Sequence, residues 1–208
     1  MSGIQPSLQR STIDVAGLPT TVFGPRDIMW WGTLGFLVIE GTTLFICVAA
    51  YFFLWRNEAT WPPEHTLRPS LFWPTVHVLF LAASNLPARQ LSKAAHALDE
   101  HRTRRWLLVL AAVAAVSLAL RWQDFLALNA RWDTNAYGSI VWLTVGLHAT
   151  LIAAELGELC LMYALLASER REERHLADAS DVAFYWYGLT LFWVPLYVMI
   201  YLGPRLLR

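Results

Sequence analysis

Apolar residues gather into five long segments along the 208-residue chain, with short polar stretches between them. A helix needs about 20 predominantly apolar residues to cross the hydrocarbon core of a bilayer. The segments at about 28–55, 138–167 and 182–203 meet this requirement clearly, and Pro195 should kink the last of them. These three segments are predicted to be transmembrane helices.

The segments at about 105–127 and 70–91 are less apolar, but each is long enough to span a membrane. The first is uninterrupted only from Trp106 to Leu120. The other carries polar residues and two prolines: Pro74, His77, Ser84, Asn85 and Pro87. Because polar groups are costly in hydrocarbon, this segment should be stable only inside a bundle or against a partner. Together the five segments predict an all-α, polytopic membrane helical bundle with five transmembrane helices.

The composition is typical of a membrane protein, because 56% of the residues are hydrophobic and the mean hydropathy is +0.40. The 16 basic residues are balanced by 16 acidic ones, which argues against nucleic acid as a partner. Both cysteines, Cys47 and Cys160, fall in apolar segments and predict no disulfide framework. We expect a cytoplasmic amino-terminal tail at 1–27 without a cleavable signal, followed by one membrane domain at 28–208.

Basic residues are distributed unevenly between the two sides of the membrane. The amino-terminal tail, the second loop and the fourth loop carry ten of them, and the opposite side carries five, with Arg121 uncounted at a span end. The positive-inside rule therefore predicts a cytoplasmic amino terminus and an external carboxyl terminus. Fifteen arginines against a single lysine suggest a GC-rich bacterial genome, so we expect a multi-pass protein of a bacterial cytoplasmic (inner) membrane.

Glu40 lies near the middle of the longest uninterrupted apolar stretch, Ile28 to Trp55. A charged carboxylate at the centre of a span costs roughly 2.5–3.5 kcal/mol on insertion scales, so such a residue usually has a use or a buried partner. Glu40 could relay protons, act as a counter-ion, or anchor a lipid or a partner. The alternative is a carboxyl group that is only hydrogen-bonded within the bundle.

The fourth span contains three polar side chains of interest. His148 and Glu155 are seven residues apart and so share one helix face, and Glu158 is one turn from Glu155. They could bind a metal, or they could make buried polar contacts with neighbouring helices or another subunit. This helix lacks the His-x-x-x-His or Glu-x-x-His spacing that places metal ligands side by side, which favours the polar contacts.

Three further ionisable residues lie in the less apolar segments. His77 could be a metal ligand or a histidine hydrogen-bonded within the bundle. Arg121 and Asp124 are one turn apart and are expected to pair locally near the outer interface. The sequence has no phosphate-binding glycine loop, Cys-x-x-Cys motif or nucleophile elbow, and only His77 and His148 lie in spans. We therefore expect no catalytic centre, metal site or haem held by this chain alone.

The apolar segments carry recognisable motifs in a fixed order along the chain. The first holds the run LGFLVIEGTTLFICVAAYFFLW with Glu40 at its centre, and WPP follows in the next loop. WQDFLAL ends the third segment, NAYGS and LTVGLH with His148 belong to the fourth, and YWYGLTLFW with Trp186 and Trp193 belongs to the last. In this order, over about residues 28–203, the motifs resemble those of subunit III of the haem-copper respiratory oxidases, in its five-helix form.

The resemblance implies a non-catalytic subunit that packs against catalytic subunit I and other oxidase subunits. Such a subunit holds phospholipid in its cleft and supports assembly and proton uptake in aerobic respiratory electron transport. Haem and copper are then bound by the catalytic partner, and this chain binds no cofactor of its own. The candidate residues for contacts with lipid or partners are Glu40, His77, His148, Glu155, Glu158, Trp186 and Trp193.

The chain departs from the family's pattern in several places, among them the second span, where His77-Val78 replaces Asn-Thr. A second histidine is replaced by Leu151, a glycine by Glu155, a histidine by Tyr187 and an aspartate by Thr190. Two alternatives therefore stay open: a subunit III-like accessory protein of a nitric oxide reductase, and an independent proton-coupled transporter that uses its membrane glutamates as a relay. Five spans without an inverted repeat disfavour the transporter.

Overall fold

The computed structural model describes residues 17–18, 20–169 and 172–206, which form helices and loops without a strand. The predicted tail at 1–27 lies largely outside the described residues. The long helices are α1 (Ile28–Asn57), α2 (Phe72–His96), α3 (Glu100–Ala127), α4 (Ala136–Ala167) and α5 (Arg174–Tyr197). A π-helical turn, η1 (Val198–Leu202), and the short α6 (Gly203–Leu206) follow Pro195, which lies inside α5. The predicted all-α fold is confirmed.

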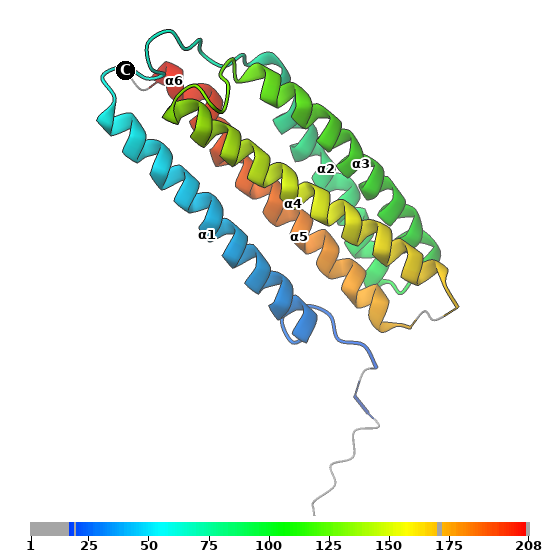
Figure 1. The fold of residues 1–208 in the computed structure, drawn as a ribbon. Helices are drawn as coiled ribbons and strands as arrows, with labels where there is room; N and C mark the ends of the chain where they lie inside the picture. The colour runs from blue at the N-terminus through cyan, green and yellow to red at the C-terminus, as the bar shows by residue number, and fades with distance from the viewer. Residues whose placement is uncertain (1–16, 19, 170–171, 207–208) are drawn as a thin grey trace, which may run out of the picture.

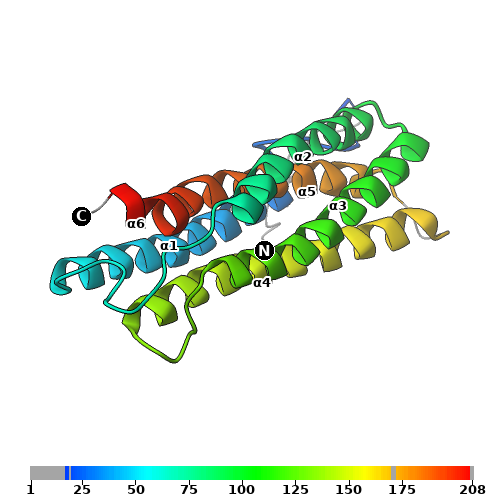
Figure 2. The same cartoon turned by 90° about the horizontal axis from the view of Figure 1, so that it is seen from above.

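The long helices lie roughly side by side along one direction (Figures 1 and 2). α4 and α5 occupy the middle, with α1 on one side and α2 and α3 on the other (Figure 1). α2 packs against α3 and α5, α3 also packs against α4, and α1 packs against α4 and α5. α1 therefore forms an edge of the bundle.

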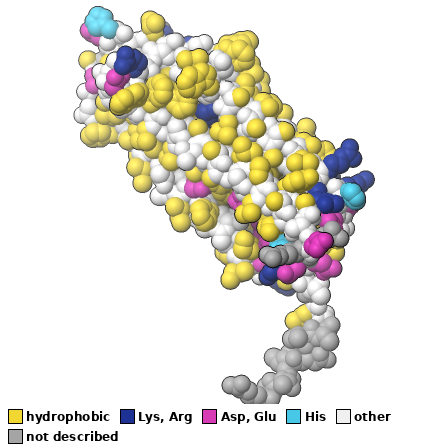
Figure 3. Space-filling model, turned by 45° about the vertical axis from the view of Figure 1, so that its right-hand side comes forward, with side chains coloured by type: hydrophobic (Ala, Val, Ile, Leu, Met, Phe, Trp, Pro, Cys, Tyr) yellow, Lys and Arg dark blue, Asp and Glu magenta, His cyan; other side chains and the backbone are white. Residues whose placement is uncertain are grey.

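Among the described residues, four helices are long and apolar enough to cross a membrane: α1, α3, α4 and the segment from α5 through Leu206. On the face shown in Figure 3, hydrophobic side chains cover the middle of the molecule, and most charged side chains gather at its two ends. This distribution fits a bilayer, because the hydrocarbon core excludes charge. The helices and this surface indicate a multi-pass membrane protein, and the fifth span, at α2, stays a prediction.

α2 turns two polar residues, His77 and Ser84, toward the rest of the bundle, whereas Arg89 and Lys93 in its last turns are exposed. Its buried positions recur every three or four residues and form one stripe: Pro74, His77, Leu81, Ser84, Ala88, Leu91 and Ala95. Large apolar residues occupy the exposed face: Phe72, Trp73, Val76, Leu79 and Leu86. The expectation that this segment packs inside a bundle is therefore confirmed.

α4 begins at a tight turn. The Asn135 side chain accepts a hydrogen bond from the backbone N–H of Gly138 at 2.8 Å and so caps the helix. A Cβ atom at Gly138 would lie only 2.1 Å from the carbonyl oxygen of Arg131. The turn therefore requires glycine at this position, which lies within the NAYGS motif.

α1 and α5 approach each other closely beside Glu40. A Cβ atom at Gly188 of α5 would lie 2.3 Å from Leu37 Cδ2, and one at Gly41 of α1 would lie 2.9 Å from Phe192 Cζ. The two glycines let a large side chain from each helix fit against the backbone of the other. This contact fixes the part of α1 that carries Glu40.

Candidate functional site

Six of the seven candidate residues form two groups. Three carboxyl side chains line a pocket between α1, α4 and α5: Glu40, Glu155 and Glu158. Three ring side chains belong to a buried polar cluster that joins α2, α3, α4 and α5: His77, His148 and Trp193. Trp186 lies in neither group, and its indole N–H donates a hydrogen bond to Ser84 Oγ at 2.8 Å.

The pocket has a volume of about 380 Å³ and a mixed lining. Apolar and small side chains accompany the carboxyl groups: Met29, Gly32, Thr33, Phe36 and Ala154, with Tyr185 at one wall. Glu40 lies twelve residues into α1, which is about 18 Å along the helix at 1.5 Å per residue. Glu40 therefore lies well inside an apolar span, where such a pocket could exchange protons or hold the polar end of an amphiphile.

Glu40 is partly buried and has one clear hydrogen-bond partner. The Tyr185 hydroxyl lies 2.7 Å from each of the two Glu40 carboxyl oxygens and donates its proton to the carboxyl group. This bond ties the centre of α1 to α5 beside the glycine contact described above. Glu40 is thus hydrogen-bonded within the bundle and also lines the pocket.

Glu155 is buried, with 1% of its surface exposed, whereas Glu158 is exposed. Neither carboxyl oxygen of Glu155 has a hydrogen-bond partner among the described residues. His148, two turns away on α4, is also buried. The helix face predicted to carry His148 and Glu155 is therefore turned toward the interior. Of these two residues, His148 is hydrogen-bonded, and Glu155 has no hydrogen-bond partner in the described part of the chain.

Asp124 is the centre of the buried polar cluster. Its Oδ2 lies 2.5 Å from His77 Nδ1 and 2.9 Å from Arg121 Nη1. His77 Nε2 lies 2.7 Å from Ser117 Oγ. A carboxylate oxygen accepts hydrogen bonds, so Nδ1–H of His77 donates to Asp124, and in the neutral imidazole Nε2 then accepts from the Ser117 hydroxyl. All four residues are buried.

Arg121 extends this cluster to α4 and α5. Its Nη2 donates to His148 Nδ1 at 2.8 Å, and its guanidinium carbon lies 3.8 Å from the centre of the Trp193 ring. Because Nδ1 of His148 accepts, its Nε2–H donates to the Leu189 carbonyl oxygen at 3.0 Å. One arginine therefore connects three helices.

The cluster is built to join helices. Both ring nitrogens of His77 and of His148 are hydrogen-bonded to protein groups. The positive charge of Arg121 is opposed by the negative charge of Asp124, which offsets the cost of burying either charge alone. Within the described ranges, no group of three or more His, Cys, Asp or Glu residues could hold a metal ion.

The local pairing predicted for Arg121 and Asp124 is confirmed, their place near the outer interface stays a prediction, and their burial was not predicted. In the structure both side chains lie inside the bundle, 1% and 0% exposed. The signal was present in the spacing, because buried positions of α3 recur every three or four residues: Leu107, Leu110, Ala114, Ser117, Arg121 and Asp124. Tyr185 was missed as a partner of Glu40, since the two residues are 145 positions apart and no local pattern connects them.

No family model matches the chain, but individual relatives do. The cytochrome c oxidase subunit 3 of Thermostichus vulcanus is 27% identical over 182 residues, which cover 86% of this chain and 89% of that protein. The probable cytochrome c oxidase subunit 3 proteins of Mycobacterium bovis and Mycobacterium tuberculosis are each 23% identical over 175 residues, or 82% of this chain and 85% of each relative. The chain is a homologue of cytochrome c oxidase subunit 3.

The likeness to subunit 3 extends over most of the bundle. The aligned regions include more than four fifths of this chain and of each relative. The resemblance to the subunit III family, inferred from ordered motifs, is therefore confirmed. In this subunit 3 homologue, Glu40 of the first motif lines the pocket, and His148 of the fourth-helix motif belongs to the buried cluster.

Proposed function

We propose that this chain is a non-catalytic, subunit III-like component of a haem-copper terminal oxidase in aerobic respiratory electron transport. The observation that carries the proposal is the match to cytochrome c oxidase subunit 3 proteins along nearly the whole chain. The two alternatives, a nitric oxide reductase accessory protein and an independent transporter, receive no support from these relatives.

Within such a complex the chain would pack against catalytic subunit I, hold phospholipid, and support assembly and proton uptake. The catalytic partner would bind the haem and copper. The buried cluster supports this division, because His77 and His148 use their ring nitrogens to connect helices. The pocket at Glu40 offers carboxyl groups and apolar walls at membrane depth, which suits contact with lipid or a partner.

Purification from the native membrane tests this proposal. A tagged chain extracted in mild detergent should co-elute with a haem-bearing subunit that consumes oxygen. The same chain, separated from its partners, should show no haem absorption band and no stoichiometric copper. A stable oligomer of this chain alone, without a haem-bearing companion, would contradict the proposal.

We further infer that α2 is the fifth span. Two polar residues in the apolar part of α2, His77 and Ser84, are buried against neighbouring helices. The exposed Arg89, Gln90 and Lys93 lie in its last turns. The face that would meet lipid carries Trp73, Val76 and Leu79. Over its apolar part, α2 therefore turns His77 and Ser84 toward protein and apolar residues outward, which suits the hydrocarbon core.

Five spans and the ten-to-five bias of basic residues predict a cytoplasmic amino terminus and an external carboxyl terminus in a bacterial inner membrane. Cysteines introduced at each end should react with a membrane-impermeant maleimide from opposite sides of intact cells and inverted vesicles. Labelling of both ends from one side would mean that α2 does not cross.

Replacement of Glu40 should separate structural hydrogen bonding from proton exchange. Glu40→Gln keeps a carbonyl acceptor for the Tyr185 hydroxyl, so it should assemble normally and keep initial oxygen consumption within a few-fold. Glu40→Leu removes the acceptor and should weaken retention of the subunit or its lipid. Retention, oxygen consumption and proton release are measured in reconstituted vesicles, with Glu64→Leu in an exposed loop as the control. A glutamine variant that assembles fully but does not turn over would make Glu40 an obligatory proton carrier.

A further inference from the structure

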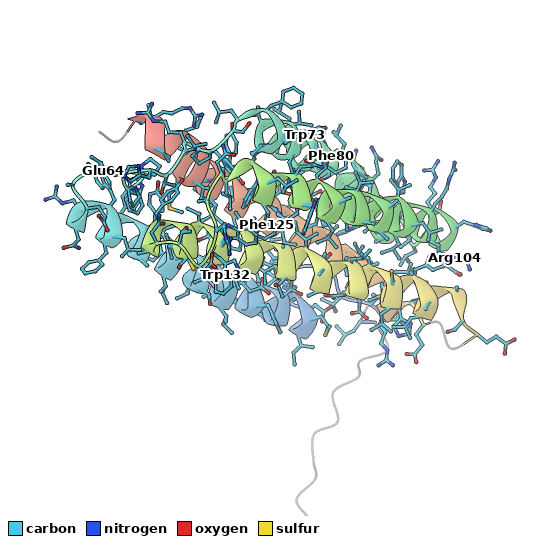
Figure 4. The ribbon with its side chains drawn as sticks, turned by 45° about the horizontal axis from the view of Figure 1, so that its top comes forward. Glu64, Trp73, Phe80, Arg104, Phe125 and Trp132 are labelled. Carbon is cyan, nitrogen blue, oxygen red and sulfur yellow. The ribbon has the colours of Figure 1, made fainter. Side chains whose placement is uncertain are left out.

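A second pocket, of about 460 Å³, lies between α2 and α3 at one end of the bundle. Eight residues line it: Gln90, Lys93, Ala94, Ala97, Arg102, Arg105, Trp106 and Val109. α2 ends at His96 and α3 begins at Glu100, so the pocket is formed where the two helices meet. Arg104 lies at this end of the molecule and Glu64 at the opposite end (Figure 4).

The polar part of this α2–α3 pocket is strongly positive. Lys93, Arg102 and Arg105 are all exposed, and none of the eight lining residues is acidic. Arg102 Nε lies 3.5 Å from the Asp99 carboxylate, at a largely exposed contact that leaves most of its charge available. Lys93 and Arg105 form no ion pair within the described part of the chain. These three basic side chains at the opening of the pocket should attract an anion.

An exposed apolar strip on α3 begins at Val109, which lines the pocket, and continues beyond it. Arg102, Val109 and Val116 are spaced seven residues apart and so lie on one face of α3, with the valines about 10 Å and 21 Å deeper at 1.5 Å per residue. Val109 and Val116 are exposed, as is Leu108 beside them. Trp106 lies between the cations and this apolar strip, a position that tryptophan favours at a membrane interface. The surface of α3 thus changes from the cationic pocket to an apolar strip along the helix.

We propose that the α2–α3 pocket binds the phosphate headgroup of an anionic phospholipid, with an acyl chain along Val109 and Val116. A basic pocket between helices that continues into an exposed apolar strip matches a ligand with an anionic head and a hydrocarbon tail. A soluble anion would contact the basic side chains of the pocket but would make no contact with the apolar strip of α3. The site lies away from the Glu40 pocket, which is formed by α1, α4 and α5, and it does not depend on the proposed oxidase function.

Native mass spectrometry of the detergent-purified full chain tests this site. Phosphatidylglycerol should bind more tightly than phosphatidylcholine with the same acyl chains, and millimolar inorganic phosphate should not displace it. The double variant Lys93→Gln/Arg105→Gln should weaken phosphatidylglycerol binding about ten-fold or more, because two charges beside the headgroup are lost. Lys93→Arg/Arg105→Lys, which keeps both charges, should retain it.

The matched control is Arg89→Gln/Arg104→Gln, which removes two basic residues of the same region that do not line the pocket. Its affinity for phosphatidylglycerol should stay within about two-fold of the unchanged chain. Equal losses in the two glutamine variants would show a general surface-charge effect and overturn the site. Equal binding of the two lipids would also overturn it, and displacement by inorganic phosphate would assign the pocket to a soluble anion.

Discussion

Replacing Asp124 by leucine should lower the free energy of unfolding by about 3–5 kcal/mol, because removing one partner leaves the other charge buried and unpaired. Arg121 is 1% exposed, and Asp124 is its carboxylate partner, at 2.9 Å. His77 would lose its acceptor at the same time. The variant should therefore separate α2 from α3 and α4 before it affects α1.

Unfolding in mixed micelles with increasing SDS, followed by circular dichroism, measures this loss. The double variant Arg121→Met/Asp124→Leu removes both charges and should recover much of the stability. Asp133→Leu is the matched control, because Asp133 accepts two hydrogen bonds from Arg131 in an exposed loop, where that arginine also lowers the pKa of the carboxyl group. The control should leave the unfolding midpoint unchanged. Equal shifts for Asp124→Leu and Asp133→Leu would show that burial of the cluster contributes little.

Replacing Gly138 by alanine should destabilise the chain by about 1–3 kcal/mol, the usual cost of forcing an extra methyl group into a packed site. The new Cβ atom would lie 2.1 Å from the Arg131 carbonyl oxygen, and a backbone atom cannot rotate away. Relief of this clash would displace the start of α4 and break the Asn135 cap.

Gly157 offers a control on the same helix, because nothing lies within 4 Å of the Cβ atom that alanine would add there. Gly157→Ala should stabilise α4 by roughly 0.5–1 kcal/mol, since glycine inside a helix is entropically unfavourable. The two variants are compared by SDS unfolding under identical conditions. Equal changes in unfolding free energy for the two variants would mean that the 131–138 turn accommodates alanine without loss of stability.

The positions of the helices could be predicted from the sequence, but their ends could not. The third apolar segment was expected from about 105, whereas α3 begins at Glu100. Hydropathy reports the part of a helix that lies in hydrocarbon, and the helix continues beyond it into the polar region. There Asp99 caps α3 by accepting a hydrogen bond from the Arg102 backbone N–H at 2.9 Å.

The candidate residues could also be chosen from the sequence, because polar side chains in apolar segments are conspicuous. Their grouping could not, since it depends on which helices are neighbours. Helical spacing places Glu155 on the face of His148, but it does not show that Glu40 of α1 lines the same pocket as Glu155. Nor does it show that Arg121 bridges from Asp124 to His148.

The burial of His77 in α2 affects how the chain enters the membrane. His77 is satisfied by Ser117 and Asp124 of α3, which are synthesised after α2. Only residues 97–99 connect the two helices. Until α3 arrives, His77 has none of these partners, and an unsatisfied polar group in lipid costs several kcal/mol. α2 and α3 should therefore leave the translocon together as one helical hairpin, and a chain truncated after residue 99 should fail to integrate its second helix.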